Sequence, residues 1–219
     1  FLLSACASVG QLGMAPSNVS IYEKKPLNIA IIIPDASRAV AKVENMDGLC
    51  FGRGDAPGAF GDIFVKTVKD RFSALFERVA IVRTINEVKD ADVIFEATFS
   101  RISYKKGCRI APEAGFAAVG KLRSVRRNGD EIWHSNKNES RILYNGILNS
   151  MNLGPDLSRR IAALVEEWIN ELQSIPVAKY APDAPSQLIA SADSPRRKIS
   201  KPKFPTRPVA VNFTKRPPR

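Results

Sequence analysis

The sequence predicts an α/β protein, an α+β sandwich in which a mixed sheet of about four to six strands carries two amphipathic helices on one face. Three observations point to this fold. An isoleucine-rich apolar run lies near the start of the chain, two long segments repeat apolar residues at helical spacing, and the segments between them alternate apolar and polar residues. The 219 residues are 44% hydrophobic and 25% charged, which is the composition of a globular protein.

Apolar patterns mark the first strand and the first helix. The run over residues 27–33 is almost continuously apolar and stops at Pro34, as is typical of a strand covered on both faces. Residues 36–57 are expected to form a long connection, and Asp55 followed by Pro57 is a favourable helix start. The helix is predicted from apolar residues spaced mostly three and four apart: Phe60, Phe64, Val68, Phe72, Leu75 and Phe76.

Five further strands are expected after this helix, over residues 79–82, 92–104, 116–126, 131–134 and 141–147. The second of them changes the phase of its alternation after Phe99, which predicts a β-bulge near Ser100. Before the change the apolar residues are Val93, Phe95, Ala97 and Phe99, and after it they are Ile102 and Tyr104. Asn128-Gly129 predicts a tight hairpin turn, because both residues tolerate positive φ.

The last predicted element is a helix that begins at Gly154-Pro155-Asp156 and ends before Pro176. Its apolar stripe comprises Leu157, Ile161, Leu164, Val165, Trp168, Ile169 and Leu172. Nine of the fifteen prolines lie from Pro176 onward, mixed with Lys and Arg. Such a composition buries too little apolar surface to offset the entropy of ordering, so residues 177–219 are predicted to be a disordered tail behind a domain at 26–176.

The first residues have the pattern of a processed export signal. Residues 1–5 match the end of a signal peptide, an apolar stretch followed by small residues. Residues 6–25 then follow as a tether, rich in small and polar residues over 7–20. We therefore expect cleavage just before Cys6.

Leu3-Ser4-Ala5-Cys6 resembles the lipobox of bacterial lipoproteins. Together with the element order over residues 27–172, it makes the chain similar to outer-membrane lipoproteins with a small α/β domain. These include the YajG-like and LptE-like lipoproteins and the lipoprotein of Pel polysaccharide secretion. The resemblance implies lipid on Cys6. Because Ala7 and not Asp follows the cysteine, it also implies sorting to the periplasmic face of the outer membrane.

The sequence offers no pattern for catalysis, and we expect neither enzymatic activity nor a metal or other cofactor. His134 is the single histidine, which excludes a multi-histidine metal site. No G-x-S-x-G motif is present, and the glycine-rich stretch 48–58 fits neither the dinucleotide-binding fingerprint nor the nucleotide-triphosphate loop. The acidic pairs Asp90/Asp92 and Glu166/Glu167 have no partner base in the sequence.

Two cysteines remain after Cys6 is assigned to lipid. Cys50 and Cys108 could form a disulfide in the oxidising periplasm, or they could stay unpaired, since the sequence does not fix their distance. No apolar run is long enough to predict a transmembrane helix.

Positive charge is concentrated at the end of the chain. Residues 179–219 contain ten basic and two acidic residues, which account for +8 of the formal net charge of +11. A polycation of this kind binds polyanions, or it serves only as a solvated extension. The residues predicted to bind a polyanion are Arg196, Arg197, Lys198, Lys201, Lys203, Arg207, Lys215 and Arg216.

The predicted function is that of a non-enzymatic accessory in envelope export, secretion or maintenance. Its expected partners are the outer membrane through the lipid, and an envelope protein or anionic cell-wall polymer through the tail. A homo-oligomer is compatible with the sequence. The alternative is a nucleic-acid-binding protein with a basic C-terminal arm, which the export signal and the nearly neutral domain disfavour.

Overall fold

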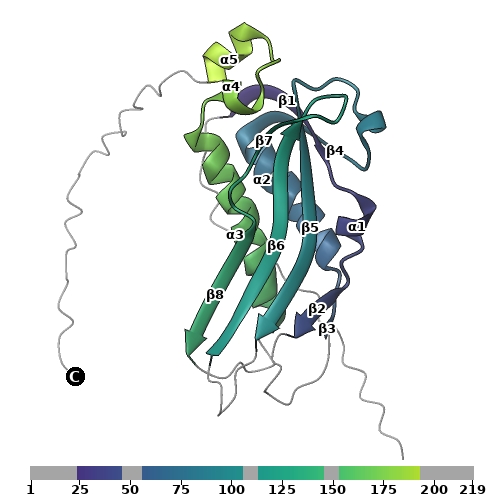
Figure 1. Ribbon diagram of the computed structural model, residues 1–219, viewed down its shortest axis with the longest axis vertical. Helices are drawn as coiled ribbons and strands as arrows, with labels where there is room; N and C mark the ends of the chain where they lie inside the picture. The colour runs from purple at the N-terminus through teal and green to yellow at the C-terminus, as the bar shows by residue number, and fades with distance from the viewer. Residues whose placement is uncertain (1–23, 46–55, 106–112, 146–152, 193–219) are drawn as a thin grey trace, which may run out of the picture.

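A computed structural model describes residues 24–45, 56–105, 113–145 and 153–192, and it confirms the α/β class. Eight strands form one mixed sheet, with helices α2 and α3 on one face (Figure 1). The strands are β1 (Lys25–Ile32), β2 (Lys42–Asn45), β3 (Ala56–Pro57), β4 (Phe76–Val82), β5 (Val93–Lys105), β6 (Glu113–Val125), β7 (Glu131–His134) and β8 (Glu139–Asn145). The helices are α1 (Asp35–Arg38), α2 (Phe60–Leu75), the 3₁₀ turn η1 (Ile85–Glu87), α3 (Leu153–Ser174), α4 (Val177–Tyr180) and α5 (Ser186–Ala192).

The long antiparallel strands β5 and β6 form the centre of the sheet. β1 runs parallel to the first half of β5, and β4 runs parallel to β1 on its outer side. β2 pairs in parallel with the second half of β5, and β3 pairs with β2. On the other side, β6 pairs with β8 along its first half and with β7 near its end. None of the described helices has both the length and the apolar character needed to cross a membrane.

β1 is the central, doubly covered strand that its apolar run predicts. Leu27, Ile29 and Ile31 belong to the main core under the helices. Ala30 and Ile32 face the other way and belong to a second, smaller cluster. Both faces are therefore buried, which explains why the strand shows no polar alternation.

The β-bulge predicted near Ser100 is present, because the pairing of β5 with β6 shifts between Phe99 and Arg101. The extra residue returns Ile102 and Tyr104 to the same core as the apolar residues before the bulge. Residues 102–104 can therefore continue β5 without turning apolar side chains to solvent.

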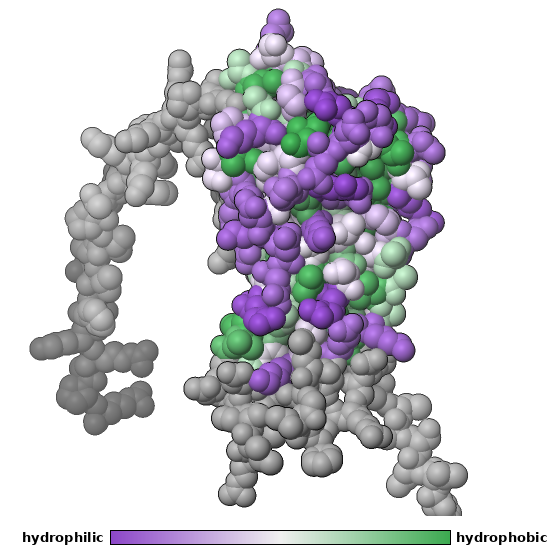
Figure 2. Space-filling view, in the orientation of Figure 1, coloured by the Kyte–Doolittle hydropathy of each residue, from purple (hydrophilic) through white to green (hydrophobic). Residues whose placement is uncertain are grey.

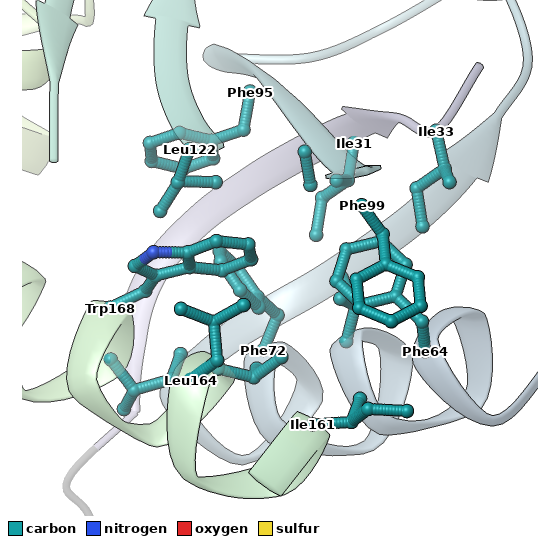
Figure 3. Packing of buried hydrophobic residues seen from close by; sticks show 14 of the residues in the cluster. Ile31, Ile33, Phe64, Phe72, Phe95, Phe99, Leu122, Ile161, Leu164 and Trp168 are labelled. Carbon is teal, nitrogen blue, oxygen red and sulfur yellow. The ribbon is translucent and has the colours of Figure 1, made fainter. Parts of the chain in front are cut away.

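Aromatic side chains fill the space between the sheet and helices α2 and α3 (Figure 3). The rings of Phe64 and Phe99 stack with centroids 4.9 Å apart, and Trp168 meets Phe64 edge-on at 6.1 Å. Phe72 meets Phe95 edge-on at 5.7 Å. The two predicted apolar stripes thus share one core, as their spacing implied.

The structure corrects the expectation of one long connection over residues 36–57. Two described parts of it form α1 and the strands β2 and β3, which brings the strand count to eight. Pro57 lies in β3, so α2 begins at Phe60 and not at Asp55–Pro57. At the other end Phe76 has an extended backbone (φ −117°, ψ 154°) and opens β4, although its spacing continues the helical stripe.

The structure also corrects the predicted start of the tail at residue 177. Residues 177–192 form α4 and α5, and both Val177 and Tyr180 are fully buried. Lys25 Nζ donates to the Leu172 carbonyl at the end of α3 (3.3 Å) and to the Tyr180 hydroxyl (3.1 Å). Pro176 precedes α4 as its N-cap, where the missing N–H of proline costs nothing, so proline content did not indicate disorder there.

Candidate functional site

Two of the four acidic residues that the sequence singled out, Asp92 and Glu166, have structural partners. Asp92 accepts the Asn28 amide (2.8 Å) and holds the start of β5 against β1. Glu166 Oε2 lies 3.2 Å from Arg71 Nη1, between α3 and α2. Within the described ranges, no group of three His, Cys, Asp or Glu residues could hold a metal ion. The exposed His134 pairs with Glu131 at 2.7 Å.

The face of the sheet opposite α2 and α3 carries ion pairs. Arg123 on β6 lies 2.9 Å from Glu96 on β5 and 3.6 Å from Glu131 on β7. The hydrogen bond to Glu96 is the main cause that raises the pKa of Arg123 above its ordinary value. The hydrogen bond with His134, followed by the contact with Arg123, lowers the pKa of the Glu131 carboxyl. In Figure 2 this face is mostly hydrophilic.

An upper cleft of about 530 Å³ opens where the start of β5, the β6–β7 turn and the α4–α5 connection meet. Its charged rim is internally paired, since Arg126 Nε donates to Asp183 Oδ2 at 3.0 Å. Arg127 donates to the Lys89 carbonyl. These contacts hold the turn against its neighbours, so the rim charges have structural partners already.

A smaller hollow of about 240 Å³, the sheet trough, lies between β5, β6 and β8. It is on the face of these strands opposite α2 and α3, which we call the helix-free face. The strand register builds it from two cross-strand rows. They are Ser103–Ala117–Arg141 and Lys105–Gly115–Leu143.

Small residues give the sheet trough its depth. A Cβ on Gly115 would lie 2.3 Å from the Ile142 carbonyl oxygen, so only glycine lets β8 come this close. Ser103 is 1% exposed, and its hydroxyl has no hydrogen-bond partner among the described residues. Leu143 is 50% exposed at the edge, and Arg141 donates to Glu139 at 2.8 Å. The trough therefore combines a buried hydroxyl with apolar and cationic neighbours, as suits a contact surface.

Sequence reasoning missed the sheet trough. Its signal was the pair of small residues Gly115 and Ala117, two positions apart along β6, of which Ala117 lies opposite Ser103. The signal becomes meaningful only once the register of three strands is known.

The predicted site residues fall outside the described residues. This applies to Cys6, Cys50, Cys108 and the tail residues Arg196, Arg197, Lys198, Lys201, Lys203, Arg207, Lys215 and Arg216. The structure does fix where two cysteine-bearing segments start. Asn45 at the end of β2 is the register partner of Tyr104 near the end of β5, and these positions precede Cys50 and Cys108.

Comparison with known proteins gives structural similarity without sequence relatives. No protein-family model and no curated protein matches the sequence. A protein from Xanthomonas campestris is 6% identical, with a TM-score of 0.47 over 70% of this chain and 91% of that chain. A neuraminyllactose-binding hemagglutinin homologue from Helicobacter pylori is 10% identical, with a TM-score of 0.44 over 74% of this chain and 90% of that chain. A minor lipoprotein from Acinetobacter baumannii is 10% identical, with a TM-score of 0.37 over 66% of this chain and 91% of that chain. Bacterial lipoproteins recur among the other structures that match.

Proposed function

We propose that this chain is a non-enzymatic lipoprotein, anchored by Cys6 in the periplasmic face of the outer membrane, that serves as an accessory in envelope export, secretion or maintenance. The observation that carries the proposal is Leu3-Ser4-Ala5-Cys6, a lipid-attachment pattern ahead of a folded domain that begins with β1 at Lys25.

The spacing between Cys6 and β1 supports this arrangement. Residues 7–24 could span at most about 60 Å when fully extended. Two or three acyl chains on one cysteine make a lasting anchor, whereas a single chain binds membranes only marginally. The domain can therefore be held at the membrane and still reach partners in the periplasm.

The surface of the domain supports an accessory function over catalysis. Asp92 and Glu166, from the two acidic pairs to which the sequence assigns no acid–base chemistry, hold secondary-structure elements together. The helix-free face offers the sheet trough, with Leu143 exposed at its edge, as a surface for contact with another molecule.

Ion pairing on this face argues against the nucleic-acid alternative. Arg123, Arg101 and Arg141 project from adjacent strands, as the cations of a phosphate-binding surface would. Each has a carboxylate partner instead: Arg123 with Glu96 at 2.9 Å, Arg101 with Glu44 at 3.8 Å and Arg141 with Glu139 at 2.8 Å. Phosphates would have to displace these partners.

We further propose that Cys50 and Cys108 form a disulfide. The pairing of Asn45 with Tyr104 supports it, because the two cysteine-bearing segments start from neighbouring strand ends. This remains a prediction about residues outside the described part of the chain.

Metabolic labelling tests the anchor. Cells that express the chain behind its export signal would be grown with a palmitate analogue. The chain should be labelled in wild type and in Cys50→Ser, and should be unlabelled in Cys6→Ser. Cys50→Ser is the matched control, since it also removes one thiol. Equal labelling of the wild type and Cys6→Ser would disprove lipidation at Cys6.

A further inference from the structure

Strand β4 is an exposed edge of the sheet. It comes last in the strand order and pairs only with β1 among the described strands. Glu77, Arg78 and Ala80 are exposed, and Val79 is half-buried. An edge of this kind presents a row of backbone N–H and C=O groups to another chain.

β4 has few of the features by which edge strands usually prevent pairing, since its charged residues Glu77 and Arg78 and its one register irregularity lie at its start. It contains no proline and no lysine, and its ladder with β1 is regular from Arg78 to Val82. Residues 79–82 are all apolar. This edge is therefore suited to pairing with a further strand.

The pairing with β1 determines which residues direct their backbone groups outward. The Val82 carbonyl accepts the Ile33 amide (2.9 Å), so the backbone of Val82 faces β1. Alternate residues of a strand direct their backbone groups to opposite sides. Val79 and Ile81 therefore present their N–H and C=O groups to the free edge, and so does the backbone of Glu77.

We propose that two copies of the chain associate through antiparallel pairing of their β4 strands, with the two-fold axis at Ala80. This register places Val79 opposite Ile81 of the partner copy, so outward-facing residues meet each other. It also places Glu77 opposite Arg83 of the partner copy, on both sides of the axis. Shifting the register by two residues either way keeps the hydrogen-bonding pattern but sets one of these charged residues opposite an apolar one.

The surroundings of β4 fit this register. Val79 and Ile81 pack at the margin of the main core, so their pairing would continue the apolar side of the sheet into the second copy. The side chain of Arg83 is 63% exposed, and its ion pair with Asp35 is long, at 3.7 Å. The Arg83 guanidinium can therefore also reach a second carboxylate. The Arg83 amide donates to Glu87 (3.2 Å), so the ladder would end at this residue.

A cysteine at the axis tests the register. The full chain would carry Ser in place of Cys6, Cys50 and Cys108, with Ala80→Cys as the probe and Arg78→Cys as the control. Directly opposed residues of a non-hydrogen-bonded pair have Cα atoms about 4.5 Å apart, within disulfide range. Two copies of residue 78 would be roughly 14 Å apart, because they are offset by four residues at about 3.4 Å each. Mild oxidation should therefore cross-link Ala80→Cys and leave Arg78→Cys monomeric on a non-reducing gel. Equal cross-linking of both variants, or of neither, would overturn the register.

Charge reversal provides a second test, read out by sedimentation equilibrium. Glu77→Lys and Arg83→Glu should each weaken dimerisation on the order of tenfold, because each creates two like-charge contacts across the axis. The double variant exchanges the charges and should restore the wild-type dimer. Circular dichroism would confirm that each variant is folded. The proposal would be refuted by a wild-type chain that stays monomeric. It would also be refuted by a dimer whose dissociation constant is the same in the wild type and in all three variants.

Discussion

At the scale of single residues, Ser37 shows how one side chain stabilises an irregularity in the sheet. The bulge between Phe99 and Arg101 interrupts the ladder of β5, and the buried Phe99 amide donates to Ser37 Oγ at 2.9 Å. A buried N–H without a partner costs free energy, so this serine allows the bulge to be buried under α1.

Replacing Ser37 tests that account. Ser37→Ala should lower the free energy of unfolding by about 1–3 kcal/mol, because the Phe99 amide would lose its acceptor in a buried place. Urea denaturation would measure the change. Ser100→Ala is the matched control, since the Ser100 hydroxyl is exposed and donates to Val119 beside the same bulge. Its effect should stay within about 0.5 kcal/mol. Equal losses for the two variants would show that Ser37 does not stabilise the bulge in this way.

The sequence could predict the bulge, but it could not predict which residue accepts the hydrogen bond from the Phe99 amide at the bulge. The phase change after Phe99 is local and visible in the order of apolar residues. Ser37 is 62 residues away from Phe99 along the chain, in a segment that the pattern indicated only as a connection. The residues of the sheet trough were hidden for the same reason, since Ser103, Ala117 and Arg141 become neighbours only through strand register.

At the scale of elements, length decided what the sequence revealed. α2 and α3 have 16 and 22 residues and repeat their apolar stripe over several turns, so both were predicted. α1, β2, β3 and α4 have two to four residues, too few for a periodic pattern to appear. β7 is equally short, and it was predicted because the Asn128-Gly129 turn marks the strand that follows it. α4 was additionally hidden by composition, because it lies among prolines.

Two truncations distinguish the predicted from the observed end of the domain. Removing residues 193–219 should leave the melting temperature almost unchanged, because the described fold ends at Ala192. Removing residues 177–219 should lower it sharply, since Tyr180 is fully buried with its ring 5.8 Å from Phe95. Losing one buried aromatic side chain alone typically costs about 3–5 kcal/mol. Differential scanning calorimetry of both proteins would show the contrast. Equal melting temperatures would mean that α4 and α5 add nothing to the stability of the domain.

At the scale of the whole molecule, the domain and the end of the chain differ in their balance of positive and negative charge. On the helix-free face and at the upper cleft, arginines such as Arg123 and Arg126 lie within 3.0 Å of carboxylates. Beyond Ala192 the balance is different, with nine basic residues and a single acidic one. The sequence predicts this separation directly, because it depends on composition and needs no knowledge of the fold.

We therefore expect binding to anionic envelope material to depend on residues 195–219 and on ionic strength. Salt screens the attraction between opposite charges in water. Raising the salt concentration from ~0.05 to ~0.5 M should therefore steeply weaken binding to anionic vesicles or cell-wall sacculi. Removing Pro195–Arg219 should abolish that binding while the domain keeps its stability. A full-length variant separates charge from length by replacing the eight predicted cations with Gln: Arg196, Arg197, Lys198, Lys201, Lys203, Arg207, Lys215 and Arg216. It should bind as poorly as the truncated chain. Tight binding by either protein, or binding that ignores salt, would place the contact on the α/β domain, where the sheet trough is the first surface to mutate.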